Sequence, residues 1–428
     1  MYFIYLVLSI GQFCVARIAY KKWVNPISTY LIIWNIMIFL YELRLVYFYD
    51  ISFAAWLLVI LFQLIFFTGC ILGNRIVIVQ KVDLDTSSDR DALMHMILIL
   101  SAISAVGLIP NFINFVRRYG MTFMDQMNVV YNDRLTGNQG YEMIPYIGTL
   151  SYLAVVAAGV YYRHFGFNRK LLIPTILMLL GTLPGGGRSG VILEIFLFLM
   201  PTLIFPRIRD RVQIKLNKTQ KIIMVLGIAG LIFVFWTMSA VRSRWITVNQ
   251  YMSPTMVKLV KISPAIYKTY VYIVEPFVAF SEWLKAPDFS FGINSFGMFY
   301  NLLNKLGMEL PYERYQTAIY TPLQGNVATY IRELIQDFTI PGALIFLFII
   351  SVGLGASYKT AQYTGSFKYE ALTSIWSTIM AMSFFVFFLR ESVFWIMIII
   401  LPIAIYINRT FYKYKINIGG VTNRHDNC

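Results

Sequence analysis

The sequence predicts an all-α protein that crosses a membrane many times, and three observations lead to this prediction. Of the 428 residues, 58% are hydrophobic and only 13% are charged, which leaves too few polar side chains for a water-facing surface. Eleven runs of about 20 residues carry little or no charge, and each can cross a hydrocarbon core of about 30 Å as a helix. The three cysteines have no metal-like spacing, so neither a disulfide nor a metal site is expected.

The predicted transmembrane helices occupy residues 1–16, 23–41, 51–74, 92–116, 143–162, 171–187, 189–206, 222–241, 338–358, 371–389 and 392–408. The first run lacks the basic start and the cleavage site of a secretory signal, so we expect it to remain in the membrane. No internal repeat of about 20–50 residues is visible. The whole chain, residues 1–428, is therefore predicted to form one integral membrane domain.

The distribution of Lys and Arg predicts how the chain is oriented. Most of the 36 basic residues fall in alternate connecting segments, which the positive-inside rule places in the cytoplasm. The N-terminus is then outside, the C-terminus is inside, and residues 242–337 form one large outer loop with amphipathic helices. Long loops in compact proteins are usually functional. Cytoplasmic segments and lipid head groups account for the net charge of +15, so no nucleic acid partner is expected.

The turn between the sixth and seventh runs, residues 185–190, reads Gly-Gly-Gly-Arg-Ser-Gly. Glycines let the backbone approach a ligand closely, and the planar guanidinium of Arg188 suits a phosphate group. Gly186, Gly187 and Arg188 are therefore predicted to bind an anion on the outer face. The alternative is a tight interhelical turn whose arginine reaches the membrane surface.

Glu194 is the one acidic residue of the seventh run. An unpaired carboxylate in hydrocarbon is unfavourable, so this side chain must face a polar cavity, carry a proton or pair with Arg188. Two interpretations stay open. Glu194 is a catalytic proton acceptor, or it is a neutral side chain that is hydrogen-bonded to a neighbouring helix.

Three further arginines are predicted near the outer surface. Arg242 and Arg244 open the large loop, while Arg390 lies beside Glu391 in the turn between the last two runs. Together with Arg188 they would supply converging positive charge for a pyrophosphate, and Glu391 is a candidate base. Taken singly, the arginines of the loop are explained by contacts with lipid head groups, and Arg390 and Glu391 by a local ion pair.

Residues 326–338 have the periodicity of an amphipathic helix, which we expect to lie at the outer membrane interface. The polar face carries Arg332, Glu333 and Asp337. Glu333 and Asp337 lie one helical turn apart, and their mutual repulsion favours one of them as a usable base. The plainer alternative is an interfacial helix with a solvated charged face.

These features resemble the O-antigen and oligosaccharide repeat-unit polymerases of the Wzy type. The resemblance rests on the glycine-arginine turn, the single large outer loop, and the sequence Asn326-Val-Ala-Thr-Tyr followed by Asp337-Phe and Gly342. It covers most of the chain in its topology, while its motifs are short. It implies a fold similar to that of C-type glycosyltransferases, a place in the bacterial cytoplasmic (inner) membrane, and chemistry without a metal or another cofactor.

The implied reaction belongs to lipopolysaccharide or related surface polysaccharide biosynthesis. A growing glycan leaves its polyprenyl (undecaprenyl) pyrophosphate carrier and joins the next lipid-linked repeat unit on the outer face. The expected partners are this lipid-linked oligosaccharide, membrane lipids and a protein that regulates chain length. The residues expected to bind pyrophosphate are Gly186, Gly187, Arg188, Arg242, Arg244 and Arg390. The candidate bases for the acceptor hydroxyl are Glu194, Glu333, Asp337 and Glu391.

Other functions remain open at this point. A flippase or another transporter of lipid-linked oligosaccharides would not be an enzyme, and it favours related halves around a charged central cavity. An O-antigen ligase ranks lower, because that family relies on an outer-loop histidine. None of the three histidines, His95, His164 and His425, is predicted to lie outside. A scaffold for other assembly enzymes is a third alternative.

Overall fold

The computed structural model describes residues 1–79, 90–121, 126–136, 146–185, 189–205, 246–311, 317–325, 327–385 and 388–422 continuously, with shorter stretches between them. These residues form α-helices and two antiparallel pairs of two-residue strands. β1 (Ile208–Arg209) pairs with β2 (Val212–Gln213), and β3 (Ile319–Tyr320) pairs with β4 (Gln324–Gly325). The predicted all-α class is therefore confirmed.

Five helices among the described residues are long and apolar enough to cross a membrane. They are α1 (Tyr2–Tyr20), α3 (Phe53–Gly73), α4 (Arg90–Tyr119), α13 (Tyr330–Thr364) and the first part, Ser392–Thr410, of α15 (Ser392–Thr422). Two apolar helices are shorter, α2 (Pro26–Glu42) and α8 (Ser189–Ile204). Other predicted runs contain α6 (Leu150–Phe165), α7 (Leu172–Thr182) and α14 (Phe367–Met382), with 3₁₀ turns η2 (Ile147–Thr149), η3 (Arg169–Leu171), η4 (Leu183–Gly185) and η5 (Phe388–Arg390) around them. Most of the predicted run 222–241 lies outside the described residues.

The start of α2 illustrates how local sequence sets a helix boundary. The Asn25 side chain accepts hydrogen bonds from the backbone N–H groups of Ile27 and Ser28, each at 3.0 Å. The Ser28 hydroxyl accepts in return from the Asn25 N–H at 2.8 Å. Together with Pro26 at the first helical position, this capping box satisfies backbone donors that a helix start leaves without partners.

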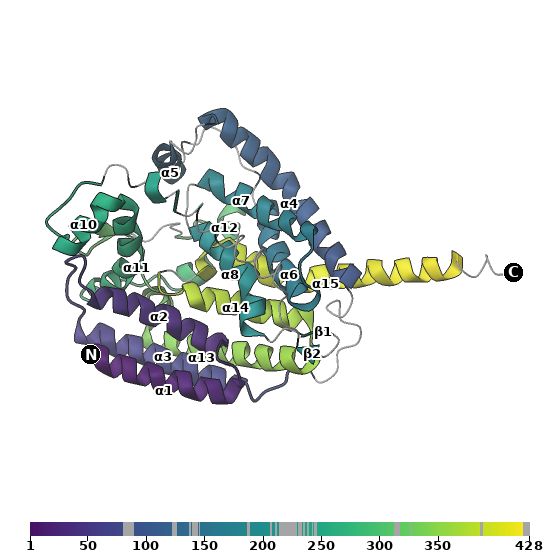
Figure 1. The fold of residues 1–428 in the computed structure, drawn as a ribbon, viewed down its shortest axis with the longest axis horizontal. Coiled ribbons are helices and arrows are strands. Elements are labelled where there is room, and N and C mark those ends of the chain that lie inside the picture. Colours follow the sequence, from purple (N-terminus) through teal and green to yellow (C-terminus); the bar gives the residue numbers. More distant parts are fainter. Residues whose placement is uncertain are drawn as a thin grey trace.

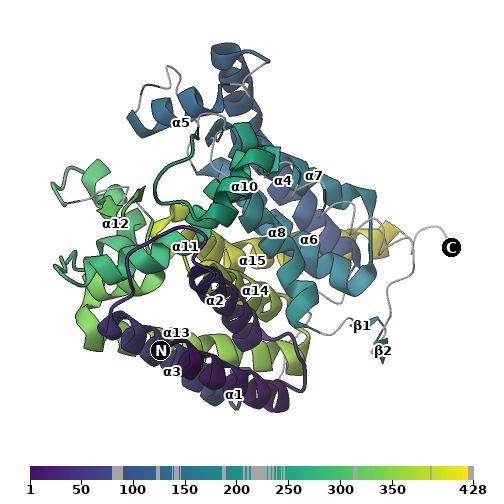
Figure 2. The ribbon, with the colours of Figure 1, turned by 60° about the vertical axis from the view of Figure 1, so that its left-hand side comes forward.

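Glycines let the membrane helices pack closely. α1, α3 and α13 lie side by side, and α4, α6, α7 and α8 form a second group, with α2 and α14 between the two groups (Figures 1 and 2). A Cβ atom on Gly73 of α3 would overlap the carbonyl of Val352 on α13, and one on Gly355 would overlap the carbonyl of Cys70. Backbone contact of this kind needs small residues, as is typical of helix pairs in membranes.

One end of the bundle collects the helix ends that the sequence places in the cytoplasm. The Tyr20 hydroxyl, at the end of α1, donates to the Cys70 carbonyl of α3 at 2.9 Å, and its ring lies 4.9 Å from that of Tyr358 near the end of α13. Arg163, near the end of α6, pairs with Glu370 at the start of α14. If successive helices cross the membrane in alternating directions, these helix ends must lie on the same side. That this side is the cytoplasm stays a prediction.

The predicted outer loop folds over the opposite end of the bundle. It contains α10 (Pro254–Ile262), α11 (Pro264–Trp283), α12 (Ile293–Lys305) and the β3–β4 pair. α10 and α11 lie on the side of the molecule where α1 begins (Figure 1), and α12 packs on α13 and η5. Outside this loop, the short helix α5 (Met127–Thr136) follows the C-terminal end of α4 in the chain. The Tyr49 N–H donates to the Thr321 carbonyl at 3.2 Å, so the turn between α2 and α3 is joined to this loop.

The expectation that the helix over residues 326–338 presents a solvated charged face is wrong. The helix begins at Tyr330, and every residue from Tyr330 to Asp337 is buried, including the charged ones. The backbone turns at Thr339, where φ is +60°, and Pro341 follows before the membrane-crossing part of α13. The polar face is covered because the segment between α11 and α12, together with η5, supplies hydrogen-bonding and charged partners for it.

Candidate functional site

Three charged side chains are buried together where α13 begins, and we call Arg332, Glu333 and Arg390 the buried charge cluster. Arg332 and Glu333 are on the first turn of α13, and Arg390 is on η5, the turn that leads into α15. Their exposed fractions are 2%, 1% and 7%. Charged residues are rarely buried unless they are paired, so this group is a candidate for binding or chemistry.

Arg390 and Glu333 form an ion pair across 57 residues of sequence. The Arg390 Nη1 donates to Glu333 Oε1 at 3.4 Å. Hydrogen bonds between a guanidinium and a carboxylate are usually about 2.7–2.9 Å long, so this one is weak for its type. Glu333 therefore pairs with Arg390 at the long end of the hydrogen-bond range.

Arg332 is the second cation of the cluster. Its guanidinium lies over the ring of Trp283, with Cζ 5.9 Å from the ring centroid. Its Nε is buried and has no hydrogen-bond partner among the residues that the structure describes. A buried donor without an acceptor is unfavourable, so an acceptor from outside the chain would stabilise this side chain.

Asp288 supplies a negative charge at the edge of the cluster. It accepts hydrogen bonds from the indole of Trp283 and from the Gln336 amide, the latter at 2.9 Å. Partial burial opposes ionisation of this carboxyl, but these hydrogen bonds and the charge of Arg332 hold its pKa below the usual value. Asp288 thus stays ionised and partly balances Arg332.

Asp337 caps a helix. Its Oδ1 accepts from the Ser290 hydroxyl at 2.6 Å and from both the backbone N–H and the side-chain amide of Asn294, each at 3.1 Å. Its Oδ2 accepts from the Ser295 N–H at 2.6 Å. Asn294 and Ser295 belong to the first turn of α12, where a carboxylate satisfies unpaired backbone donors and the helix dipole. This arrangement favours a structural role for Asp337.

The other predicted carboxylates lie apart from one another. Glu391 is exposed, and the local ion pair expected with its neighbour is replaced by the Arg390–Glu333 pair. Glu194 is fully buried on α8, which packs on α6 and α14, and neither carboxylate oxygen has a hydrogen-bond partner among the described residues. The expected repulsion between Glu333 and Asp337 is relieved, because each has its own positively charged or N–H partners.

Five of the predicted pyrophosphate-binding residues lie outside the described part of the chain: Gly186, Gly187, Arg188, Arg242 and Arg244. Arg390 is the predicted member of that set that the structure describes, and it lies in the buried charge cluster. The structure adds Arg332, which the sequence placed on a solvated face. The sequence signal for this burial is a polar face that carries charges of both signs directly before a membrane span. That signal does not identify the residues that contact Arg332.

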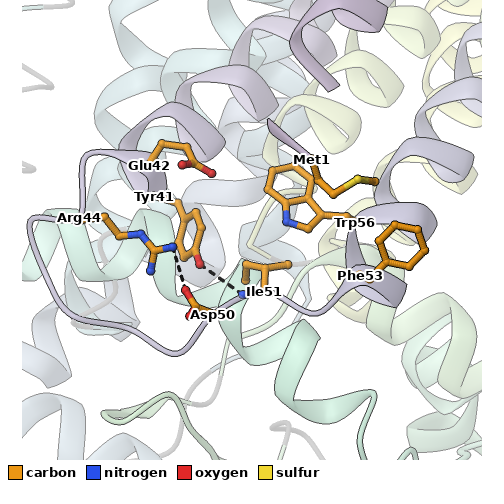
Figure 3. A pocket seen from close by; sticks show the side chains of 8 residues that line it. All are labelled: Met1, Tyr41, Glu42, Arg44, Asp50, Ile51, Phe53 and Trp56. Carbon is orange, nitrogen blue, oxygen red and sulfur yellow. Dashed lines mark hydrogen bonds and ion pairs between the residues drawn. The ribbon is translucent and has the colours of Figure 1, made fainter. Parts of the chain in front are cut away.

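A separate cavity of about 300 Å³ lies at the turn between α2 and α3 (Figure 3). The Arg44 side chain reaches across it to Asp50, with Nη2 2.8 Å from Oδ1, and lies 4.8 Å over the Tyr41 ring. The lining residues are Met1, Tyr41, Glu42, Arg44, Asp50, Ile51, Phe53 and Trp56. None of the predicted site residues lines this cavity. The positive charge in its lining, Arg44, is already paired with the exposed carboxylate of Asp50.

The fold and these contacts define an all-α membrane protein with a buried charge cluster at one end of its helical bundle. Comparison of the chain with protein-family models, with characterised proteins and with solved structures gives no match. The function is therefore argued from the cluster itself.

Proposed function

We propose that the protein polymerises lipid-linked oligosaccharide repeat units on the outer face of a bacterial cytoplasmic membrane. It is a metal-independent glycosyltransferase that takes the growing glycan from polyprenyl pyrophosphate. The observation that carries the proposal is the burial of two arginines, Arg332 and Arg390, beside the carboxylate of Glu333. A diphosphate offers an acceptor oxygen for the Nε of Arg332, which has none among the described residues, and its oxygens suit the planar guanidinium of Arg390.

The proposed reaction uses fixed cations in place of a metal. The acceptor hydroxyl oxygen attacks the anomeric carbon of the growing glycan, and the bond from that carbon to the pyrophosphate oxygen breaks. Negative charge develops on the pyrophosphate, where Arg332 and Arg390 stabilise it together with Arg188, Arg242 and Arg244. The acceptor proton passes to a carboxylate. Glu333 and Glu391 are the proposed bases closest to Arg390, whereas Asp337 is occupied as a helix cap.

The proposed orientation places the cluster outside and the Arg163–Glu370 end inside. The basic residues of the connecting segments support it, and the eleven spans predicted from the sequence would bring the two ends to these sides. Reporter fusions within residues 246–311 test this orientation. Cytoplasmic activity of such fusions would refute the proposed function, since lipid-linked repeat units would then be out of reach.

The test is elongation by the purified protein. Lipid-linked repeat units are supplied in the presence of a metal chelator, and the products are sized. The proposal expects chains of several repeat units from the wild-type protein and single units from Arg332→Lys and Arg390→Lys, because lysine cannot replace a planar fork of donors. Arg169→Lys, an exposed position at the other end of the bundle, is the matched control and should elongate normally.

Thermal unfolding of each variant in detergent shows whether loss of elongation follows loss of structure. Wild-type chain lengths from both Arg332→Lys and Arg390→Lys would refute the assignment. In cells, deletion of the gene should leave single repeat units on the surface lipid. Loss of all surface glycan would instead indicate a transporter or a ligase.

One observation favours the second candidate, a transporter of lipid-linked oligosaccharides. Glu194 is fully buried in an apolar helix, and among the described residues its carboxylate has no hydrogen-bond partner. Buried carboxylates of this kind serve proton-coupled movement in membrane transporters. Glu194→Gln should abolish flipping of a lipid-linked oligosaccharide in vesicles if the protein is a transporter. It should leave elongation in place if the buried charge cluster performs the chemistry.

A further inference from the structure

α12 carries an exposed apolar stripe. Phe299, Leu302 and the C-cap residue Leu306 follow one another at i, i+3 and i+7, so they lie on one side of the helix. Their exposed fractions rise along the helix, from 36% to 51% to 72%. In a water-soluble protein an amphipathic helix turns such a stripe toward the core. Here the stripe points outward.

Three polar side chains of the same helix are hydrogen-bonded within the protein. The Asn301 amide donates to the Tyr146 hydroxyl at 3.4 Å, and the Lys305 ammonium donates to the same oxygen at 3.2 Å. Lys305 also lies 5.0 Å over the Tyr146 ring. Asn304 completes this side by accepting from the Leu310 N–H at 2.8 Å. Lys305 itself is exposed, while its ammonium is held at Tyr146, so the stripe and a basic side chain lie on the same exposed part of the helix.

The exposed stripe continues the apolar surface of the membrane helices. The Phe299 ring lies 5.2 Å from that of Trp395 at the start of α15, and the Phe296 ring lies 6.4 Å from that of Phe346 on α13. Below these contacts α13 exposes a row of isoleucines, which includes Ile349. α12 stands at the edge of the molecule beside the start of α13 (Figure 2). These ring contacts join α12 to the two helices, α13 and α15, that are apolar enough to cross the membrane.

We infer that α12 is embedded in the membrane interface, with Phe299, Leu302 and Leu306 inserted among the acyl chains of the leaflet at that end of the bundle. The occupant of the stripe is lipid, because α12 packs on the starts of two apolar helices, α13 and α15, that are long enough to cross the membrane, and because α13 also exposes isoleucines. Trp395 and Lys305 lie at the level where aromatic and basic side chains anchor membrane proteins. This inference holds for any reaction that the chain performs.

The test measures the depth of single positions by spin labelling. A variant without the native cysteines receives one cysteine in place of Leu302 or, in a separate protein, Leu306, and each is labelled with a nitroxide. The proteins are reconstituted into vesicles of phosphatidylethanolamine and phosphatidylglycerol. Collision with oxygen, which dissolves in lipid, is compared with collision with a water-soluble nickel complex. Ile349→Cys is the lipid-facing control and Lys285→Cys the water-facing control, since both positions are exposed.

The inference expects the oxygen-to-nickel ratio at positions 302 and 306 to match that at position 349 and to exceed that at position 285 several-fold. Ratios equal to the value at position 285 would overturn it. Strong dipolar broadening, with shielding from both reagents, would also overturn it by showing that a second copy of the chain covers the stripe. Two separate labelling positions keep the test valid if one variant fails to fold.

Discussion

Replacement of Asp337 by Asn distinguishes a helix cap from a catalytic base. The carboxylate accepts four hydrogen bonds, three at Oδ1 and one at Oδ2. An Asn side chain has one acceptor oxygen, so its NH₂ group would face either the Ser295 N–H or the donors of Ser290 and Asn294. At least one hydrogen bond is then lost, and at least one buried donor is left without an acceptor.

The expected loss follows from these contacts. A hydrogen bond to a charged group contributes about 1.5–3 kcal/mol, and the charge at a helix N-terminus contributes about 0.3–1 kcal/mol more. Together they predict that Asp337→Asn destabilises the start of α12 by about 2–4 kcal/mol. Since about 1.4 kcal/mol is a factor of ten, amide hydrogens that exchange through opening of this cap should exchange about 30- to 800-fold faster.

Hydrogen exchange followed by mass spectrometry measures this effect in peptides that cover residues 290–300. The same variant should leave exchange in α2 and α3 unchanged. Asp133→Asn is the matched control, because that carboxylate accepts from the Tyr119 hydroxyl at 2.9 Å and is remote in sequence from α12. Unchanged exchange in α12 combined with complete loss of glycan elongation would refute the reasoning, and Asp337 would then be the base.

Three further predictions concern other parts of the chain. Glu370→Gln should lower the stability by about 3 kcal/mol in thermal unfolding, because Arg163 would remain buried without its carboxylate; an unchanged melting temperature would contradict this. Burial, and then the charge of Arg163, lowers the pKa of Lys22 to about 8, so the folded state carries this charge unfavourably below that pH. Lys22→Met should therefore stabilise the protein at pH 7 by about 1 kcal/mol, after allowance for solvent screening. The gain should shrink as the pH rises from 8 to the unfolded value of 10.5, and a gain that grows with pH would contradict this sign. Arg188→Lys should abolish elongation while the protein level persists, and wild-type chain lengths would remove Arg188 from the site.

The sequence located the site only in part. Arg390 and Glu333 were both candidates, but as members of different groups: one as a turn arginine, the other on a helix face. Their pairing joins residues that are 57 positions apart and is therefore a long-range contact, which helix periodicity does not report. Arg332 was assigned to a solvated face, because amphipathicity separates polar from apolar sides and does not say whether protein or water meets the polar side.

The all-α class and the membrane-crossing segments follow from the sequence itself. Hydrocarbon offers no partner for backbone N–H and C=O groups, so a long apolar run in a membrane must form a helix whatever its neighbours are. Only the tertiary structure determined the partners of the polar groups, which are the start of α12 for Asp337 and Glu333 for Arg390. It also determined that the apolar stripe of α12 is exposed. Such contacts depend on how the loop folds back over the bundle, and the directions of individual side chains are fixed only when that packing is complete.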